Sequence, residues 1–273
     1  MTSMAAPIAC ARMYNVCPAA QALWDALFGL ISERAGVGLN VIAHAAPAPL
    51  AELWASPRIG AVFMCGYPFS RLKKEERPIP LAAPVSHESW AHGGPFYASH
   101  IVVPADSPAQ CPADLAGARW GWTARDSQSG YHAPRAWLAA LGPSSAPAPA
   151  SVGALINPSG VIAALRDRRI DVGAVDAYAF QLLAHHDADS IADLRILATT
   201  PSVPAPMLVA ARALPAPQAD ALRDALRGLH RDRTGAGLLA MLGLKTFAAV
   251  DADGYGQLPR AAARAGRLLA TKW

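Results

Sequence analysis

Apolar runs of strand length alternate with helix-forming stretches along the first part of the chain. The run Ile8–Tyr14 is followed by a helix that opens at Pro18, and strand-like runs at Leu39–His44 and Ile59–Met64 flank a second, shorter helix. Such alternation is typical of folds in which parallel strands share one sheet and the loops at their carboxyl ends carry the functional groups. The chain is therefore predicted to be an α/β protein.

A second alternating series begins in the middle of the chain. The longest strand signal, Phe96–Val103, and the proline-rich stretch before Pro204 are the two places where the chain can pass between two units. We therefore expect a first lobe of residues 1–100 and 204–273, with a second lobe of residues 101–203 inserted into it. The segment after Ala211 is predicted to be helical and to cover the first lobe.

The stretch Ala118–Leu138 is interpreted as a strand, a polar turn and a helix. Ser127, Ser129 and Gly130 lie where the helix starts, so hydroxyls and free backbone N–H groups converge at the positive end of the helix dipole. Such a helix start can hold an oxyanion. An ordinary serine or aspartate N-cap without a ligand is the alternative that the turn by itself leaves open.

Three further polar side chains follow predicted strands. Tyr14 and Tyr67 end two strands of the first series and should reach the same edge of the sheet, although either ring can also be ordinary packing. Asp176 follows the strand-like run Ile170–Val175. Tyr14 and Tyr67 are therefore candidates for contact with a ligand.

Charge and hydropathy exclude two classes of partner. The 24 Lys and Arg residues against 20 Asp and Glu leave a net charge of +4, and the basic residues are scattered, so we expect no nucleic-acid surface. Although 53% of the 273 residues are hydrophobic, no apolar stretch reaches the length of about 18 residues that a membrane helix needs. We therefore expect no membrane insertion.

The sequence predicts neither a metal nor a cofactor. The four cysteines are far apart and include no C-x-x-C pair: Cys10, Cys17, Cys65 and Cys111. They are expected to be free thiols that are buried or half-buried. His87, Glu88 and His92 have the chemistry of metal ligands, but their glycine-containing loop offers no rigid element to fix them.

Several short motifs occur in a recognisable order: Met13-Tyr14-Asn15, Cys65-Gly66-Tyr67-Pro68, Phe96-Tyr97 leading to Ile101-Val102-Val103, Asp126-Ser127-Gln128-Ser129-Gly130-Tyr131, and Arg169-Ile170-Asp171-Val172-Gly173-Ala174-Val175-Asp176. In this order and spacing they resemble the phosphate/phosphonate-type substrate-binding proteins of ABC transporters, which have the type II periplasmic binding protein fold. The resemblance runs over most of the chain.

The resemblance implies a two-lobed α/β fold with mixed central sheets and a hinge, closing over a small polar, anionic ligand of phosphonate or phosphate type. It implies ligand-binding residues on both lobes: Tyr14, Tyr67 and Tyr97 on the first, and Ser127, Gln128, Ser129, Gly130, Tyr131 and Asp176 on the second. It also implies a monomer without catalytic activity and an ABC permease as partner if the protein serves uptake.

The sequence departs from this family in two respects. Phosphonate binders of the family usually carry a histidine near the helix start Asn157-Pro158-Ser159, where this chain has proline. The chain as given also shows no export signal, so we expect a cytoplasmic protein, or a periplasmic one if a leader is missing. Two alternatives stay open: an enzyme of the same fold, of lyase or thiamine-precursor type, with Asp176 as base, or a ligand-sensing module.

Overall fold

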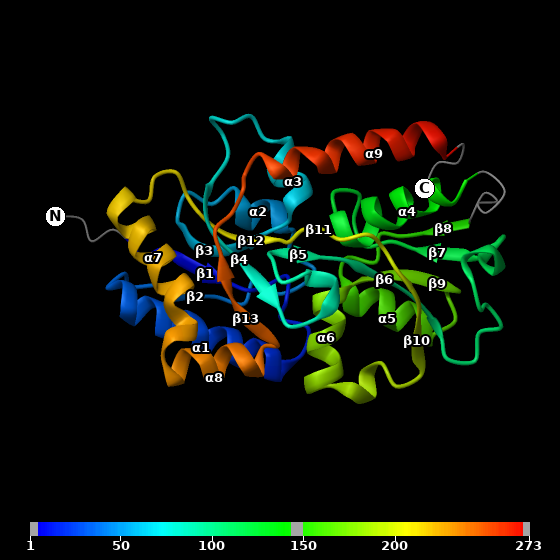
Figure 1. The fold of residues 1–273 in the computed structure, drawn as a ribbon, viewed down its shortest axis with the longest axis horizontal. Coiled ribbons are helices and arrows are strands. Elements are labelled where there is room, and N and C mark those ends of the chain that lie inside the picture. Colours follow the sequence, from blue (N-terminus) through cyan, green and yellow to red (C-terminus); the bar gives the residue numbers. More distant parts are fainter. Residues whose placement is uncertain (1–4, 143–149, 270–273) are drawn as a thin grey trace. The chain divides into compact units, whose positions relative to one another are not determined.

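Strands and helices alternate through residues 5–142 and 150–269, the parts of the chain that this computed structural model describes (Figure 1). They form two compact units. The first unit contains the chain up to Phe96 together with Pro204–Gly254. The second contains Tyr97–Val203 together with the segment from Tyr255 onward. Each unit has its own sheet.

The first unit is built on a mixed sheet with the strand order β13-β4-β12-β3-β1-β2. β2, β1 and β3 are parallel to one another, whereas β12, β4 and β13 join through antiparallel pairs. The strands are β1 (Ile8–Cys10), β2 (Asn40–Val41), β3 (Ile59–Met64), β4 (Ile79–Ser86), β12 (Met207–Ala210) and β13 (Leu244–Ala248).

The long helix of the first unit, α1 (Pro18–Ala35), packs on the sheet through one apolar face. Trp24, Leu27, Phe28 and Ile31 are all fully buried, and their spacing places them on the same side of a helix. The helix ends at Gly36, whose φ of 61° is the left-handed conformation that glycine adopts without strain. The other helices of this unit are α2 (Leu50–Trp54), α3 (Gly66–Arg71), η1 (Ser89–Ala91), α7 (Ala216–Gly228), η6 (Leu229–Arg231) and α8 (Arg233–Met241).

The second unit has a five-stranded mixed sheet with the order β10-β6-β9-β7-β8. β9, β7 and β8 are parallel, and β6 and β10 are antiparallel to their neighbours. The strands are β6 (Ser99–Pro104), β7 (Arg119–Gly121), β8 (Ala150–Val152), β9 (Val172–Asp176) and β10 (Leu194–Thr199). The helices are η2 (Pro112–Leu115), η3 (Gln128–His132), α4 (Ala133–Leu141), α5 (Pro158–Arg166), α6 (Ala177–His186), η5 (Ala188–Ser190) and α9 (Gln257–Leu268).

The strand signal at residues 96–103 is divided in the structure. β5 (Phe96–Tyr97) pairs with β11 (Val203–Pro204) in a two-stranded sheet of its own, and β6 begins at Ser99. The chain passes from one unit to the other within each of these two short strands. It passes a third time at Gly254 and Tyr255, within η7 (Gly254–Gly256).

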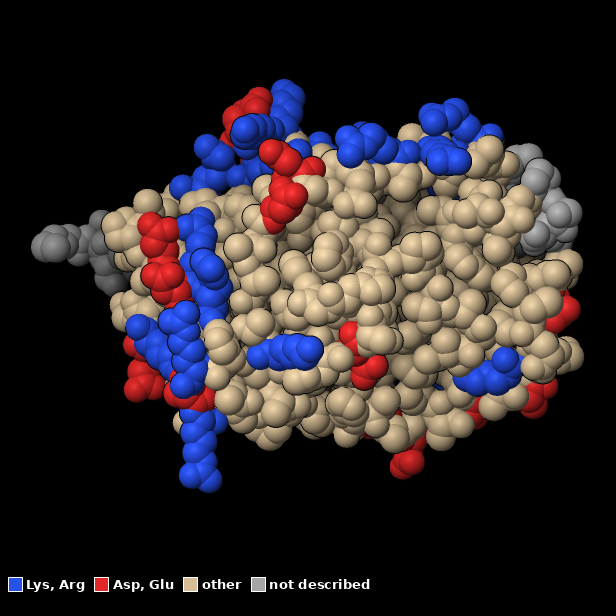
Figure 2. Space-filling view, in the orientation of Figure 1, with Lys and Arg blue, Asp and Glu red and all other residues tan. Residues whose placement is uncertain are grey.

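The C-terminal helix differs from the sequence expectation, which assigned residues up to 273 to the first lobe. α9 belongs to the second unit, where it packs against α4. The buried side of α9 consists of Leu258, Ala262 and Ala265. Its opposite side carries exposed arginines, and basic side chains gather over α9 at the upper right of Figure 2. A helix with one apolar and one basic side can pack on any apolar surface of matching shape. The sequence therefore does not specify which unit α9 covers.

A second correction concerns the region after residue 211, which was expected to be entirely helical. β13 interrupts it and pairs with β4 at the edge of the first sheet. Leu244 and Phe247 are the buried side chains of this short strand. Two inward residues with polar neighbours give too weak an alternation to identify a strand from the sequence.

Candidate functional site

The polar turn of the second unit connects β7 to α4. Ser127 caps the helical segment, because its Oγ accepts a hydrogen bond from the N–H of Gly130 at 3.0 Å. The next turn is wider than an α-helical one: the N–H of His132 donates to the carbonyl of Ser127 at 3.1 Å. Single wide turns of this kind often occur at functional sites.

Gly130 and Thr123 approach each other closely across this turn. A Cβ atom at Gly130 would lie 2.1 Å from Thr123 Oγ1, so no larger residue fits there unless the turn moves. The buried Oγ1 of Thr123 has no hydrogen-bond partner among the residues that the structure describes. A buried hydroxyl without a partner is costly, which makes Thr123 a candidate donor to a bound group. The sequence interpretation missed this residue, and the only available signal was its position at the end of a predicted strand.

Ser129 joins the turn to the end of β9. Its side chain hydrogen-bonds to the carboxyl group of Asp176, and its backbone carbonyl accepts a hydrogen bond from Ser99 Oγ at 3.0 Å. Asp176 Oδ1 in turn accepts from the N–H groups of Tyr178 and Ala179, at 3.0 and 3.1 Å, and so caps α6. The candidate residues Ser129 and Asp176 are therefore in direct contact.

Burial raises the pKa of Asp176 to about 7, although the hydrogen bonds from Ala179, Tyr178 and Ser129 act in the opposite direction. The carboxyl group thus changes its charge near neutral pH. Its neutral form does not repel an anion, and it can donate a proton to Ser129 Oγ, which frees the Ser129 hydrogen for another acceptor.

Tyr131 and Gln128 are both buried. The Tyr131 ring belongs to an apolar cluster with Trp122, and Arg125 donates to its hydroxyl at 2.9 Å. The guanidinium of Arg135 lies over the same ring, 5.0 Å from its centroid. The Tyr131 side chain thus supports the turn through contacts with Trp122, Arg125 and Arg135.

The three tyrosines of the predicted first-lobe group have different environments. Tyr14 is 1% exposed, and its ring packs edge-on against Phe63 with centroids 4.9 Å apart. Tyr67 is half-buried in α3, just after β3. Tyr97 is buried and belongs to the second unit, whereas the sequence expectation placed it on the first lobe. The structure therefore brings Ser127, Ser129 and Asp176 together in the second unit.

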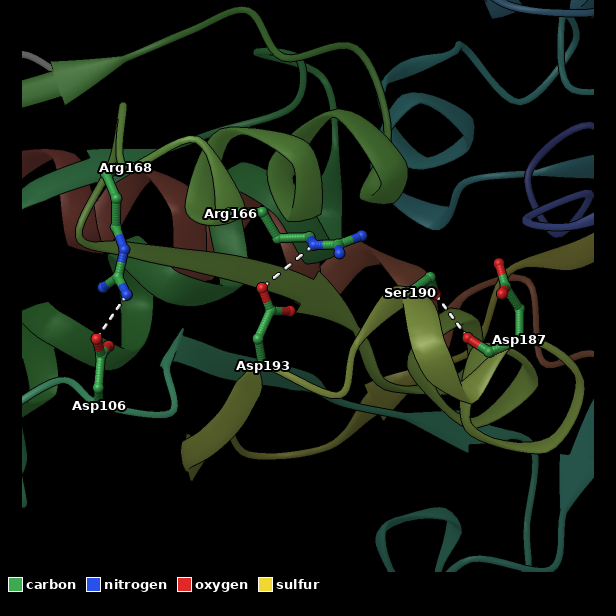
Figure 3. A network of polar contacts seen from close by, with 6 residues as sticks. All are labelled: Asp106, Arg166, Arg168, Asp187, Ser190 and Asp193. Carbon is green, nitrogen blue, oxygen red and sulfur yellow. Dashed lines mark hydrogen bonds and ion pairs between the residues drawn. The ribbon is translucent and has the colours of Figure 1, made fainter.

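Acidic side chains on the outer surface of the second unit are engaged elsewhere (Figure 3). Arg168 pairs with Asp106 at 2.6 Å, and Arg166 pairs with Asp193 at 3.2 Å. Ser190 Oγ donates to the carbonyl oxygen of Asp187 at 2.7 Å. The two ion pairs are exposed, whereas the Ser190 hydrogen bond is half-buried, and none of the three contacts includes a residue of the candidate site.

No group of three or more His, Cys, Asp or Glu side chains in the described residues could hold a metal ion. His87, Glu88 and His92 therefore form no such group there. The four cysteines are free thiols; Cys10, Cys17 and Cys65 are buried, whereas Cys111 is exposed, contrary to the expectation that all would be at least half-buried. Within residues 5–142 and 150–269, no helix is both long and apolar enough to span a membrane.

Comparison with known proteins decides the family. The model of the ABC-transporter phosphonate periplasmic substrate-binding proteins matches residues 18–255. The chain belongs to this family. A search of curated proteins found no match.

Several solved structures are similar to this chain over nearly its whole length. A binding protein component of an ABC phosphonate transporter from Pseudomonas aeruginosa has a TM-score of 0.77 at 16% identity, covering 96% of this chain and 88% of that one. PhnD1 from Prochlorococcus marinus, in complex with methylphosphonate, has a TM-score of 0.73 at 14% identity, covering 96% and 98%. A Xanthomonas citri protein bound to ATP has a TM-score of 0.61 at 17% identity, covering 97% and 98%.

These findings confirm the predicted family, the two-lobed periplasmic binding protein fold class and the role as a solute-binding protein. The family is one of transporter components that bind small ligands in the periplasm. The cytoplasmic location expected for the chain as given stays a prediction.

Proposed function

We propose that this phosphonate-family protein binds a small oxyanion at the turn Ser127–Tyr131, with Asp176 beside it, and passes it to an ABC permease as a monomer without catalysis. The observation that carries the proposal is the Thr123 hydroxyl, which is buried at this turn without a hydrogen-bond partner among the described residues. Ser127 supports it, because its Oγ is used as an acceptor and its hydroxyl hydrogen can still be donated.

The chemistry of the turn suits a phosphonate or phosphate group. Hydroxyl hydrogens of Thr123 and Ser127, together with N–H groups at the start of the helical segment, are donors, and oxyanions accept several donors at once. The solved relatives with bound methylphosphonate and ATP both carry phosphorus oxyanions. Phosphonate and phosphate are therefore the first ligands to test.

The remaining predicted residues have distinct roles in this proposal. Gln128 and Tyr131 hold the turn in shape, Gly130 allows its close approach to Thr123, and Asp176 fixes Ser129. Tyr67 belongs to the first unit and is half-buried there. Tyr14 and Tyr97 are buried residues. Their hydroxyl groups are therefore the atoms that we propose for ligand contact.

An enzyme of the same fold is the second candidate, and one observation favours it. A carboxyl group with a pKa of about 7, as at Asp176, is matched to proton transfer at neutral pH. However, that carboxyl group already accepts two backbone N–H groups and the Ser129 hydroxyl, which is the environment of a structural cap. We therefore prefer binding without turnover.

A thermal-shift series followed by phosphorus NMR tests the proposal. Methylphosphonate, inorganic phosphate, methanesulfonate and acetate are added at millimolar concentration and constant ionic strength. A ligand at one hundred times its Kd stabilises the folded protein by about 2.7 kcal/mol, so a tight oxyanion is readily detected. We expect methylphosphonate or phosphate to stabilise the protein. The phosphorus NMR spectrum should then show that the ligand is chemically unchanged. No stabilisation by either would contradict oxyanion binding, and a new phosphorus signal would favour the enzyme.

A further inference from the structure

Arg12 lies in the loop between β1 and α1, at the carboxyl edge of the parallel part of the first sheet. β1 is the middle strand of the parallel trio, between β2 and β3. The loops that follow β1 and β3 therefore leave the sheet at the same edge. The second of these loops leads into α3, which carries Tyr67. Open α/β sheets bind their ligands at this edge.

The guanidinium of Arg12 is partly buried and forms no ion pair with any residue that the structure describes. Its Nε is shielded from solvent and makes no hydrogen bond to any residue in the described part of the chain. Burial lowers the pKa of Arg12, and the neighbouring Cys10 acts in the opposite direction. Asp25 influences the Cys10 thiol but forms no ion pair with Arg12 in the described structure. Desolvating a cation without pairing it costs free energy of folding.

Two neighbouring features point to an anion as the missing partner. Asn15 Oδ1 in the same loop is also buried and lacks a hydrogen-bond partner among the described residues. Rotation of this amide by half a turn would present its NH2 group instead. The 18-residue helix α1 then starts at Pro18 with no side-chain cap from Cys17 and no acidic residue in its first turn. Its first N–H groups and positive dipole end are therefore not neutralised by local side chains.

We propose that Arg12, with the amide of Asn15 and the start of α1, forms an oxyanion subsite on the first unit. The subsite takes a phosphonate, phosphate or carboxylate group, because a guanidinium offers a planar pair of N–H donors that matches two oxygens of such a group. It rests on the proposed function and adds to it a cationic subsite in the loop after β1. The sequence interpretation chose Tyr14 in this loop, whereas the structure packs the Tyr14 ring into the core and leaves Arg12 Nε without a partner among the described residues.

The substitutions Arg12→Met and Arg12→Lys test the subsite with two readouts. Methionine keeps a long flexible side chain without the charge, and lysine keeps the charge without the planar donors. Urea unfolding of the ligand-free protein measures stability, and calorimetric titration with methylphosphonate measures affinity. Arg227→Met, at an exposed arginine of α7, is the matched control.

Arg12→Met is expected to raise the urea midpoint of the ligand-free protein without changing the m-value, because it removes a desolvated charge. It should weaken methylphosphonate binding at least about tenfold, since a charged hydrogen-bonding partner is lost. The affinity of Arg12→Lys should lie between those of wild type and Arg12→Met. A lowered urea midpoint in Arg12→Met would show that the guanidinium stabilises the fold, and unchanged affinity would show that it does not hold the ligand. Either result overturns the subsite.

The same titration of Ser129→Ala separates this proposal from the one on which it rests. If Ser129→Ala loses affinity and Arg12→Met does not, the oxyanion site of the second unit stands and the Arg12 subsite is wrong. If Arg12→Met loses affinity and Ser129→Ala does not, the subsite stands and the ligand is not held by the turn of the second unit.

Discussion

Ser129 donates its hydroxyl to the carboxyl group of Asp176, which joins the turn before α4 to the cap of α6. The two residues lie far apart in sequence, yet their contact makes the polar turn and the end of β9 one hydrogen-bonded unit. A change at either residue therefore alters the donors that the other can offer to a ligand.

Replacing Ser129 by alanine should destabilise the protein more at high pH than at low pH. At pH 8 the substitution removes a hydrogen bond to an ionised carboxylate, which contributes about 1.5–3 kcal/mol, whereas at pH 5 it removes a bond to a neutral carboxyl group, which contributes about 1 kcal/mol. Urea unfolding at both pH values measures the difference. An equal loss at pH 5 and pH 8 would mean that Asp176 does not change its charge between them.

Replacing Asp176 by asparagine should remove one component of the pH dependence of stability. The folded-state pKa of Asp176, about 7, lies above the ordinary value of 3.8, so this group stabilises the folded protein fully below the ordinary value. That contribution is lost as the pH rises through 7. Asparagine also caps helices well. The variant should therefore gain stability over wild type as the pH is raised from 4 to 8, measured by urea unfolding.

The buried histidines change the stability of the folded protein in the opposite direction over the same pH range. Burial lowers the pKa of His100 and His132 to about 4, so their contribution is lost as the pH falls from the ordinary value of 6.5 toward 4. The histidine contributions cancel in the difference in unfolding free energy between Asp176→Asn and wild type, since both proteins contain both histidines. A difference that is flat from pH 4 to 8 would contradict the raised pKa of Asp176.

Replacing Thr123 by valine separates the hydroxyl from the shape of the side chain. Valine fills nearly the same volume, and the Oγ1 that it removes has no hydrogen-bond partner in the described structure. We expect the ligand-free protein to be as stable as wild type or more stable, because an unpaired buried hydroxyl is unfavourable. Affinity for methylphosphonate should fall about tenfold if the hydroxyl donates to the ligand. Lower stability with unchanged affinity would assign Thr123 a purely structural role.

Strand positions could be predicted where an apolar run is continuous. β3 begins and ends at the residues expected from the sequence, Ile59–Met64. β13 could not be found, because two buried side chains among polar ones give little periodicity. The unit to which α9 belongs could not be predicted either. An amphipathic pattern indicates that one side of a helix is covered, but it does not identify the surface that covers it.

The candidate site shows a similar limit. The order strand, polar turn, helix correctly identified the position of Ser127 and Ser129, because helix starts have strong local signals. In the loop after β1, the sequence indicated a polar edge but not which side chain turns inward. The N–H of Tyr14 donates to the carbonyl of Ala11 at 2.7 Å, and this tight turn directs the Tyr14 ring into the core. Such a turn depends on contacts with distant residues, among them Phe63.

Calorimetric titration of methylphosphonate into wild type and Ser129→Ala tests the central claim most directly. Ser190→Ala, which removes a hydroxyl from the same unit outside the candidate site, is the matched control. If the turn holds an oxyanion at pH 6, where neutral Asp176 donates to Ser129 Oγ and frees the Ser129 hydrogen for the ligand, Ser129→Ala should weaken binding at least about tenfold, while Ser190→Ala binds like wild type. Equal affinities for wild type and Ser129→Ala would show that the turn only caps its helix and that the protein holds its ligand elsewhere.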